Sequence, residues 1–217
     1  MIGGFFVTGT DTDVGKTWVS CQLVRAFRAK GVDAVGMKPF SCGDRADAEA
    51  LDLANGGTVE MGLVNPVWLR VPASPYAASL IENRTLDVAT AQDAYAVLSK
   101  NHRVVVVEGV GGWRVPLTDQ MCMSDFAVEM DLPVLVVAAN RIGALNHTRL
   151  TVEAIQQRGL RVAGILWNEV SAGESDPARM TNRAVFEQLM PGIFQADIAH
   201  GSESLDETLL AHLLEML

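Results

Sequence analysis

The sequence has few cysteines, no excess of basic residues and no long apolar run, and each absence excludes a class of protein. Cys21, Cys42 and Cys122 lie far apart with no C-x-x-C spacing, which argues against a disulfide framework or a zinc site. The net charge of -9 offers no basic face for nucleic acid or for an anionic membrane. No apolar run approaches roughly 18 residues, the length of a membrane span, and no secretory signal pattern is present. We therefore expect a cytoplasmic protein without nucleic-acid or membrane partners.

The chain also lacks internal repeats, low-complexity tracts and linkers rich in proline and glycine. Its 217 residues are near the upper end of a single compact domain and can bury a sizeable core. Hydrophobic residues make up 49% and charged residues 20%, which is the balance of a globular protein. We expect one domain over residues 1–217.

Short β-branched runs alternate with longer runs rich in alanine, leucine and arginine, as in an α/β fold. The runs VVVVE and VLVVAAN are apolar at successive positions, which is typical of parallel strands covered by helices on both faces. The predicted strands are residues 4–8, 33–38, 103–108, 133–140, 161–168 and, more weakly, 192–198. We therefore predict a mostly parallel central sheet between two layers of helices.

Two helices have clear sequence patterns. Residues 17–31 carry Val19, Leu23 and Phe27 on one face and end in Gly31, which predicts an amphipathic helix with a glycine cap. Residues 44–57 have acidic residues at the start and glycines at the end, which predicts a shorter helix. We expect residues 59–76, which contain several prolines, to form loop and edge structure.

Polar residues stand at the end of each predicted main strand. They are Lys16 in the loop after the first strand, then Lys38, Glu108, Asn140 with Arg141, and Asn168 with Glu169. In an open parallel sheet, ligands bind beyond the carboxyl ends of the strands. The sequence therefore predicts a ligand site at this edge.

Residues 9–17, GTDTDVGKT, give the strongest functional pattern. Gly9 and Gly15 allow successive backbone N–H groups to point inward, Lys16 can reach terminal phosphates, and the Thr17 hydroxyl can coordinate Mg2+. Five residues separate the glycines, where the usual P-loop has four. The pattern predicts a P-loop NTPase-like fold; the alternative is an ordinary glycine turn with a helix-capping threonine.

Three further residues are candidates for the same site. Lys38 precedes Pro39, which enforces an extended exit from the strand, and it would add a second cation beside the γ-phosphate; otherwise it is a solvated surface lysine. Glu108 follows four valines and precedes GVGG, which suits a metal ligand. Asp47 is either a second carboxylate for the metal or a favourable charge in the first turn of a helix, and spacing alone favours the helix charge.

Six motifs together resemble the dethiobiotin synthetase family over most of the chain: GTDTDVGKT, GMKP, VVEGVGGW followed by PL, LPVLVV, GALNH and WNEV. The most specific are the Thr-Asp-Thr-Asp interior of the first motif and the EGVGGW segment. The resemblance implies an ATP-dependent cyclo-ligase that converts 7,8-diaminononanoate and CO2 into dethiobiotin, with Mg2+ as cofactor and ADP and phosphate as products. The route implied is a carbamate, then a carbamic-phosphoric anhydride, then ring closure.

The resemblance also assigns roles to residues of this chain. Catalysis falls to Lys16 and Lys38. The nucleotide and its metal would contact Asp13, Val14, Gly15, Lys16, Thr17, Trp18, Asp47, Glu108, Gly109, Val110, Gly111, Asn168 and Glu169. The metal ligands among these would be Thr17, Asp47 and Glu108. The substrate would contact Thr12, Ser41, Cys42, Gly143, Leu145 and Asn146. The GALNH segment would receive the substrate carboxylate across a dimer interface, so the resemblance implies a homodimer.

Three assignments stay open at the level of sequence. Alignment with the family favours Cys42 as the substrate contact, whereas a hydroxyl is the better hydrogen-bond donor and favours Ser41. Asp44 competes with Asp47 for the metal. The acidic residues Asp11 and Asp13 either attract the substrate's amines or shape the turn.

Two other P-loop functions remain as alternatives. A partition-type or metallocluster-assembly ATPase would act as a nucleotide-driven dimer switch, but such proteins usually carry an extra lysine early in the loop, where this sequence has none. A small-metabolite kinase would be expected to carry an arginine-rich lid, and the arginines here are scattered. No Ser-His-Asp or Cys-His triad is evident.

Overall fold

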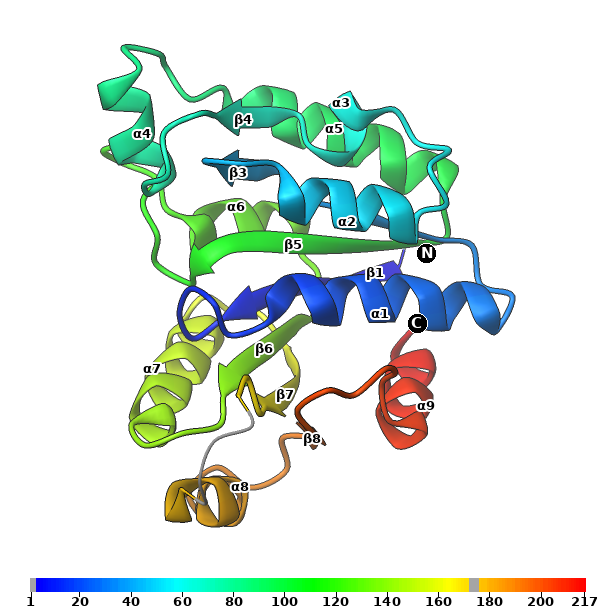
Figure 1. Cartoon of the computed structure of the whole chain (residues 1–217), viewed down its shortest axis with the longest axis vertical. Helices are drawn as coiled ribbons and strands as arrows, with labels where there is room; N and C mark the ends of the chain where they lie inside the picture. Colours follow the sequence, from blue (N-terminus) through cyan, green and yellow to red (C-terminus); the bar gives the residue numbers. More distant parts are fainter. Residues whose placement is uncertain (1–2, 172–175) are drawn as a thin grey trace.

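Six parallel strands form the central sheet (Figure 1). The computed structural model describes residues 3–171 and 176–217. The strand order is β2-β5-β1-β6-β7-β8, and each pairing is parallel. The strands are β1 (Gly3–Gly9), β2 (Ala34–Met37), β5 (Val104–Gly112), β6 (Val134–Ala139), β7 (Val162–Asn168) and β8 (Gln195–Ile198). All six predicted strands are confirmed.

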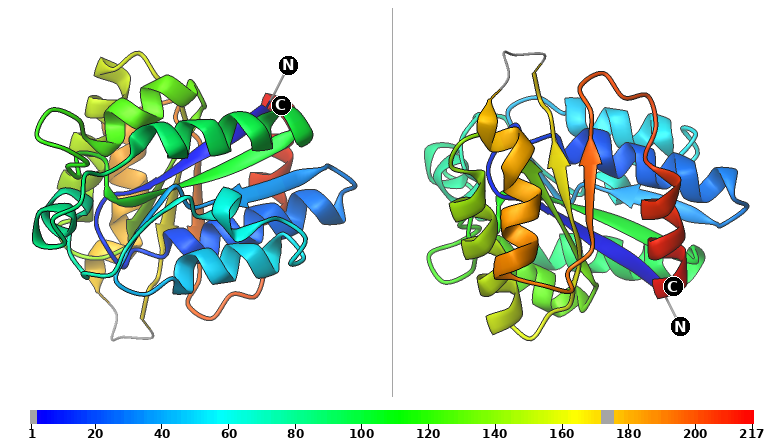
Figure 2. Two further views of the ribbon diagram at one scale, coloured as in Figure 1. Left: turned by 90° about the horizontal axis from the view of Figure 1, so that it is seen from above. Right: turned by 90° about the horizontal axis from the view of Figure 1, so that it is seen from below.

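Helices cover both faces of the sheet, as the views from above and below show (Figure 2). One face packs against α1 (Lys16–Ala29), α2 (Ala46–Ala54) and α9 (Glu207–Met216). The opposite face packs against α5 (Val88–Asn101), α6 (Met123–Met130), α7 (Ala144–Gln157) and α8 (Pro177–Leu189). The predicted α/β fold with two helical layers is therefore confirmed.

Successive strand residues enter opposite cores, which explains the continuous apolar runs. Phe5 stacks on Phe27 of α1 with ring centroids 6.0 Å apart, whereas Phe6 meets the edge of Trp113 on the other face at 6.2 Å. Val104 and Val106 join the α1 side, and the valines between and after them join the α5 side. Burial on both faces requires an apolar side chain at each position.

An insertion between β2 and α5 agrees only in part with the prediction of loop and edge structure for residues 59–76. Besides α2, it contains β3 (Phe40–Cys42), α3 (Met61–Val64), β4 (Val67–Leu69) and α4 (Pro75–Ile81). Within residues 59–76, β4 is edge structure as predicted, whereas α3 and the start of α4 are helical. β3 and β4 pair in parallel as a separate two-stranded sheet. Each of these strands has only three residues, too few for a hydrophobic period to be recognised in the sequence.

Among residues 3–171 and 176–217, no helix combines the length and the apolar character needed to cross a membrane.

Candidate active site

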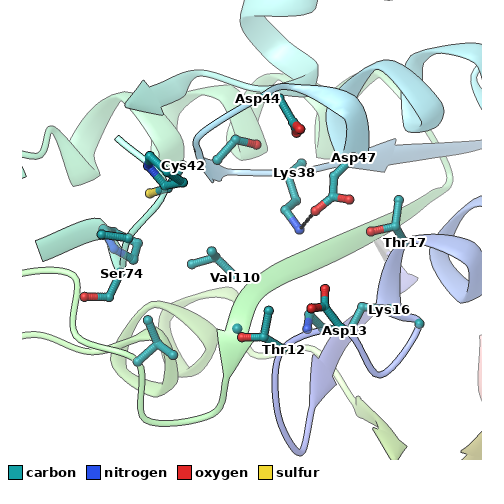
Figure 3. Close-up of a pocket in the computed structure, with 17 residues that line it drawn as sticks. Thr12, Asp13, Lys16, Thr17, Lys38, Cys42, Asp44, Asp47, Ser74 and Val110 are labelled. Carbon is teal, nitrogen blue, oxygen red and sulfur yellow. Dashed lines mark hydrogen bonds and ion pairs between the residues drawn. The ribbon is translucent and has the colours of Figure 1, made fainter. Parts of the chain in front are cut away.

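One cavity of about 730 Å³ joins the phosphate loop to the ends of β2 and β5 (Figure 3). It lies at the carboxyl edge of the sheet, where the strand order places β5 between β1 and β2. The insertion supplies the opposite wall. The lining residues are Thr12, Asp13, Gly15, Lys16, Thr17, Lys38, Ser41, Cys42, Asp44, Asp47, Pro72, Ala73, Ser74, Pro75, Val110, Gly111 and Val115.

The phosphate loop ends in the left-handed conformation that its glycine permits. Gly15 has φ 95° and directly precedes α1. A Cβ atom at this position would lie 2.2 Å from Nδ2 of Asn168, so a larger residue would collide with β7. The side chain of Asn168 donates a hydrogen bond to the Val14 carbonyl at 2.9 Å. The loop is thereby anchored to the end of β7 and leaves its N–H groups at the start of a helix, an arrangement that suits phosphate.

Lys16 is buried beneath this loop. Its ammonium donates to the Asp11 carbonyl at 3.0 Å, and the side chain is 7% exposed. Burial, followed by repulsion from Lys38, lowers the pKa of Lys16 from 10.5 to about 8. The charge on Lys38 therefore affects the protonation of Lys16.

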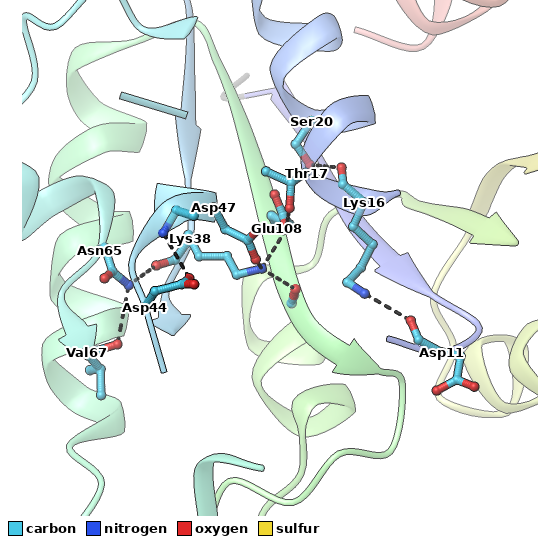
Figure 4. A network of polar contacts seen from close by, with 12 residues as sticks. Asp11, Lys16, Thr17, Ser20, Lys38, Asp44, Asp47, Asn65, Val67 and Glu108 are labelled. Atoms are coloured by element: carbon cyan, nitrogen blue, oxygen red, sulfur yellow. Dashed lines mark hydrogen bonds and ion pairs between the residues drawn. The ribbon is translucent and has the colours of Figure 1, made fainter. Parts of the chain in front are cut away.

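Lys38 is not a solvated surface lysine: it is 3% exposed and forms the centre of a buried ion-pair network (Figure 4). Its Nζ lies 2.5 Å from Oε1 of Glu108 and 2.7 Å from Oδ2 of Asp47. Burial opposes the charge, but the carboxylates of Glu108 and Asp47 outweigh it and raise the pKa of Lys38. For Asp47, likewise, burial favours the neutral form, and Lys38 outweighs it and lowers the pKa. Lys38 and Asp47 are therefore both charged at neutral pH.

Glu108 has one carboxylate oxygen that is free for a further ligand. Its Oε1 accepts from Thr17 Oγ1 at 2.8 Å as well as from Lys38, while Oε2 is buried without a partner among the described residues. The donor set of Thr17, Glu108 and the half-exposed Asp47 consists of oxygens, which fits Mg2+. The parts of the chain that the structure describes contain no cluster of three or more His, Cys, Asp or Glu side chains suited to a metal. A cation here would therefore share its coordination with a hydroxyl, water and ligand oxygens.

Asp44 also lines the cavity, but its contact differs from that of Asp47. Oδ1 of Asp44 accepts from the Ala46 N–H at 3.2 Å, which shapes the turn before α2. Asp47 lies in the first turn of α2 and reaches Lys38. The contacts therefore favour Asp47 over Asp44 as the metal-side carboxylate.

Ser41 and Cys42 both line the cavity from β3, and their chemistry differs. The hydroxyl of Ser41 is buried and has no partner among the described residues. Burial, and to a lesser degree Glu82, raises the pKa of Cys42 to about 11, so it stays a thiol and a weak donor. The unpartnered hydroxyl makes Ser41 the better hydrogen-bonding group for a ligand.

A second cavity of about 370 Å³ begins on the other side of the phosphate loop. Asp13 and Gly15 line both cavities. The second cavity is also lined by Trp18, Asn168, Glu169, Val170, Ile198, Ala199, His200, Gly201 and Ser202. The family resemblance assigned Trp18, Asn168 and Glu169 to the nucleotide, and the structure brings them together here. Residues 199–202 were not assigned; the signal that could have found them is the end of the weak strand β8 at this same edge.

The end of β6 does not contribute its polar residues to either of these cavities. Asn140 donates to the Arg179 carbonyl at 3.2 Å and accepts from Asn182 at 2.9 Å, and Asn182 also donates to the Arg141 carbonyl. These contacts hold α8 against the sheet. The expectation that each strand end serves the ligand site is wrong at β6.

The GALNH segment lies at the start of α7, apart from the main cavity in one copy of the chain. Gly143 has φ 87° and precedes the helix. Leu145 and Asn146 line a separate surface depression with Leu150 and Leu189. None of Gly143, Leu145 and Asn146 lines the main cavity, so the structure does not bring these three predicted substrate contacts to Lys38.

The chain is similar to known proteins along nearly its full length. A family model described as "AAA domain" matches residues 3–193. The ATP-dependent dethiobiotin synthetase BioD of Akkermansia muciniphila is 44% identical over 95% of this chain and 96% of its own length. The protein of that name from Anaeromyxobacter dehalogenans is 44% identical over 96% of this chain and 97% of its own length.

Solved structures with low sequence identity share the fold alone. Hydrogenase maturation factor HypB from Archaeoglobus fulgidus has a TM-score of 0.61 at 13% identity, covering 99% of this chain and 89% of that one. A ParA family ATPase from Chlorobium tepidum has a TM-score of 0.56 at 11% identity, covering 99% and 90%. The sequence relatives are far more similar and match at nearly full length, and so the chain belongs to the ATP-dependent dethiobiotin synthetase family.

Proposed function

We propose that the protein catalyses the ATP-dependent carboxylation and ring closure of 7,8-diaminononanoate to dethiobiotin. The observation that carries this proposal is the cavity that the phosphate loop shares with Lys38 and Asp47, where the buried Glu108 also contacts Lys38. One substrate amine adds to CO2 and forms a carbamate, and the carbamate oxygen takes the γ-phosphoryl group of ATP, releasing ADP. The second amine then attacks the carbamoyl carbon, expels phosphate and closes the cyclic urea.

The two cavities divide the work of binding. The N–H groups of residues 13–18 and the ammonium of Lys16 would hold the phosphates, and the smaller cavity beside Asn168 and Glu169 would hold the base. The larger cavity, with Thr12, Ser41 and Cys42, would hold the diamine. Because Asp13 and Gly15 line both cavities, the phosphate tail would lie between the base and the acceptor.

Thr17, Asp47 and Glu108 would hold Mg2+, which when bound neutralises charge on the phosphates. Thr17 and Glu108 are already oriented toward each other at 2.8 Å. Lys38 contacts both carboxylates, so its ammonium must exchange these partners for the carbamate and the transferring phosphoryl group. Phosphoryl transfer depends mainly on such positioning and charge neutralisation.

The protein would act as a homodimer in the cytoplasm, where ATP is available. Exposed apolar side chains near the start and along the outer side of α7 and α8 support the dimer: Ile142, Leu150 and Leu189 are 83%, 58% and 53% exposed. Burying such side chains between two copies is favourable. The start of α7 would then offer its N–H groups to the substrate carboxylate of the partner copy.

The reaction itself is tested by measuring ADP release with ATP, bicarbonate and 7,8-diaminononanoate. We expect release only when both co-substrates are present, together with dethiobiotin detectable by mass spectrometry. ATP hydrolysis that is independent of the diamine would contradict the proposal and would favour a nucleotide-driven switch.

Asp13 and Asp11 should differ in their effect on the diamine. Asp11 accepts from the Thr12 N–H at 2.8 Å and so shapes the turn, whereas Asp13 lines the substrate cavity. We expect Asp13→Asn to raise KM for the diamine roughly threefold to tenfold, since one exposed charge contributes about 1 kcal/mol, with little change in KM for ATP. Asp11→Asn is the matched comparison in the same steady-state assay. An unchanged diamine KM in both variants would remove the electrostatic role.

Nucleotide affinity should fall at alkaline pH because Lys16 loses its proton. The pKa of Lys16 in the ligand-free protein is about 8, and triphosphate binding favours the charged form. Below pH 8 most of Lys16 carries its proton, and above pH 8 most of it does not. The dissociation constant for MgATP should therefore be about tenfold higher at pH 9 than at pH 7. Calorimetric titration between pH 7 and 9.5 measures this.

The variant Lys38→Ala supplies the control for this titration. Lys38 repels the charge on Lys16, so its removal should move the weakening to higher pH. A MgATP affinity that stays constant up to pH 9.5 in the wild type would refute the assignment.

A further inference from the structure

The peptide of Lys38 is held from outside the central sheet. β2 ends at Met37, where it pairs with Val107 of β5, and Pro39 lacks an N–H group. The Lys38 N–H donates to the Val64 carbonyl at 2.7 Å. The Lys38 carbonyl accepts from Nδ2 of Asn65 at 2.8 Å. The adjacent residues 64 and 65 of the insertion therefore hold both sides of the backbone that carries the lysine.

Asn65 is 2% exposed, and its carboxamide is fully engaged. Nδ2 also donates to the Val67 carbonyl at 3.3 Å, and Oδ1 accepts from Nε of Arg45 at 3.0 Å. The main-chain carbonyl of Asn65 accepts from Nη2 of Arg45 at 3.1 Å. A buried carboxamide with this set of partners has one favourable orientation.

Arg45 connects Asn65 to the helix that carries Asp47. It directly precedes α2, and Asp47 is two residues further on. The Arg45 guanidinium lies over the Trp68 ring at 5.2 Å, and Nε1 of Trp68 donates to the Gly43 carbonyl at 2.8 Å. The turn before α2 is thereby fixed to the same part of the insertion.

We propose that Asn65 is a positioning residue for catalysis. Its carboxamide holds the carbonyl of Lys38, as Figure 4 shows, and also accepts from Arg45 at the start of α2. Asn65 thereby sets the position of the lysine relative to Asp47. Asn65 itself does not line the cavity and acts through Lys38. The kinetic part of this inference rests on the proposed function, because displacement of a catalytic group by about 1 Å can cost up to a hundredfold in rate.

The test compares Asn65→Asp with Asn55→Asp. Asn55 is also buried, and its Nδ2 donates to the carbonyl of Gly36 at 3.0 Å, two residues before Lys38 on the same strand. Each substitution removes the amide donor from a backbone carbonyl in this segment, and Asn65→Asp also removes the donor from the Val67 carbonyl. We expect Asn65→Asp to lower kcat about tenfold with KM for ATP within about twofold, and Asn55→Asp to change kcat less than about twofold. Equal losses of kcat in the two variants would overturn the inference.

A double-mutant cycle separates positioning from general destabilisation. In the Lys38→Ala background, Asn65→Asp should lower kcat no further, because the group that it positions is absent. The same tenfold loss in both backgrounds would overturn the inference. Thermal unfolding monitors folding of each variant, and Asn65→Ser, which avoids a buried charge, replaces Asn65→Asp in the cycle if the aspartate variant does not fold.

A spectroscopic readout keeps the inference separate from the proposed reaction. In ligand-free protein, the 1H–15N signal of the Lys38 ammonium, assigned by its loss in Lys38→Ala, should shift in the Asn65 variant and stay in place in Asn55→Asp. An unmoved signal in the Asn65 variant overturns the positioning role. Failure of the wild type to form dethiobiotin instead contradicts the proposed function and leaves this signal to decide the role of Asn65.

Discussion

Replacing Lys38 by alanine should lower kcat by roughly a hundredfold to a thousandfold, which corresponds to about 3 to 4 kcal/mol of transition-state stabilisation. The ammonium is buried in the cavity beside the phosphate loop, where a low dielectric strengthens its interaction with developing charge. Lys16 cannot replace it, because Lys16 is already directed at the loop and donates to the Asp11 carbonyl.

The measurement is the rate of dethiobiotin formation at saturating substrates, with Lys100→Ala as a matched control. Lys100 is an exposed lysine near the end of α5. The end of α5 lies shortly before the start of β5, so Lys100 lies toward the amino edge of the sheet, opposite the cavity. Its loss should leave kcat unchanged. A Lys38→Ala enzyme with near-normal kcat would contradict the assignment of Lys38 to the phosphoryl and carbamate groups.

Glu108→Gln should affect both activity and stability. The side chain is fully buried, and Oε1 contacts Lys38 and Thr17. The amide cannot neutralise Lys38, and breaking a buried ion pair by removing one partner costs about 3 kcal/mol. For a chain of this size, that loss lowers Tm by about 6 to 12 °C.

The same substitution should also raise the Mg2+ concentration that gives half-maximal activity by about tenfold or more, because an anionic oxygen ligand is lost. Asp47→Asn is the informative comparison. Asp47 is half-exposed, so its variant should lose about 1 kcal/mol or less of stability while the Mg2+ requirement still rises. If Glu108→Gln keeps the wild-type Mg2+ dependence, Glu108 does not serve the metal.

The helices and strands that could be predicted from the sequence are those whose hydrophobic pattern and end signals lie in consecutive residues. The apolar run of β1, the glycine loop and the amphipathic α1 follow one another without interruption, and each is specified by neighbouring residues. The end of β2 was located because proline follows Lys38 directly, whereas β5 continues past the predicted end at Glu108 to Gly112. Parallel pairing of β1, β2 and β5 then brings Lys38 and Glu108 into contact beside the phosphate loop.

Other features depend on contacts between distant segments and could not be predicted. Whether Asn140 faces a ligand or a helix is decided by Asn182, 42 positions further along the chain. The ion pair between Lys38 and Glu108 could not be predicted either, because the two residues are 70 positions apart in sequence. Asn65 carries no motif at all, and its role in the network follows only from the fold that brings it to Arg45 and to the Lys38 carbonyl.

The insertion between β2 and α5 bears on how the acceptor substrate of such an enzyme can change in evolution. Ser41, Cys42 and residues 72–75 come from this one continuous stretch, whereas the phosphate loop and the walls of the smaller cavity come from β1, α1, β7 and the segment after β8. Most of the wall that would face the acceptor is therefore encoded in one stretch of the gene, although this stretch also carries Asp47 and the phosphate loop contributes Thr12. Exchange of this stretch should change which acceptor receives the phosphoryl group, provided that residues equivalent to 64 and 65 still hold the backbone of Lys38.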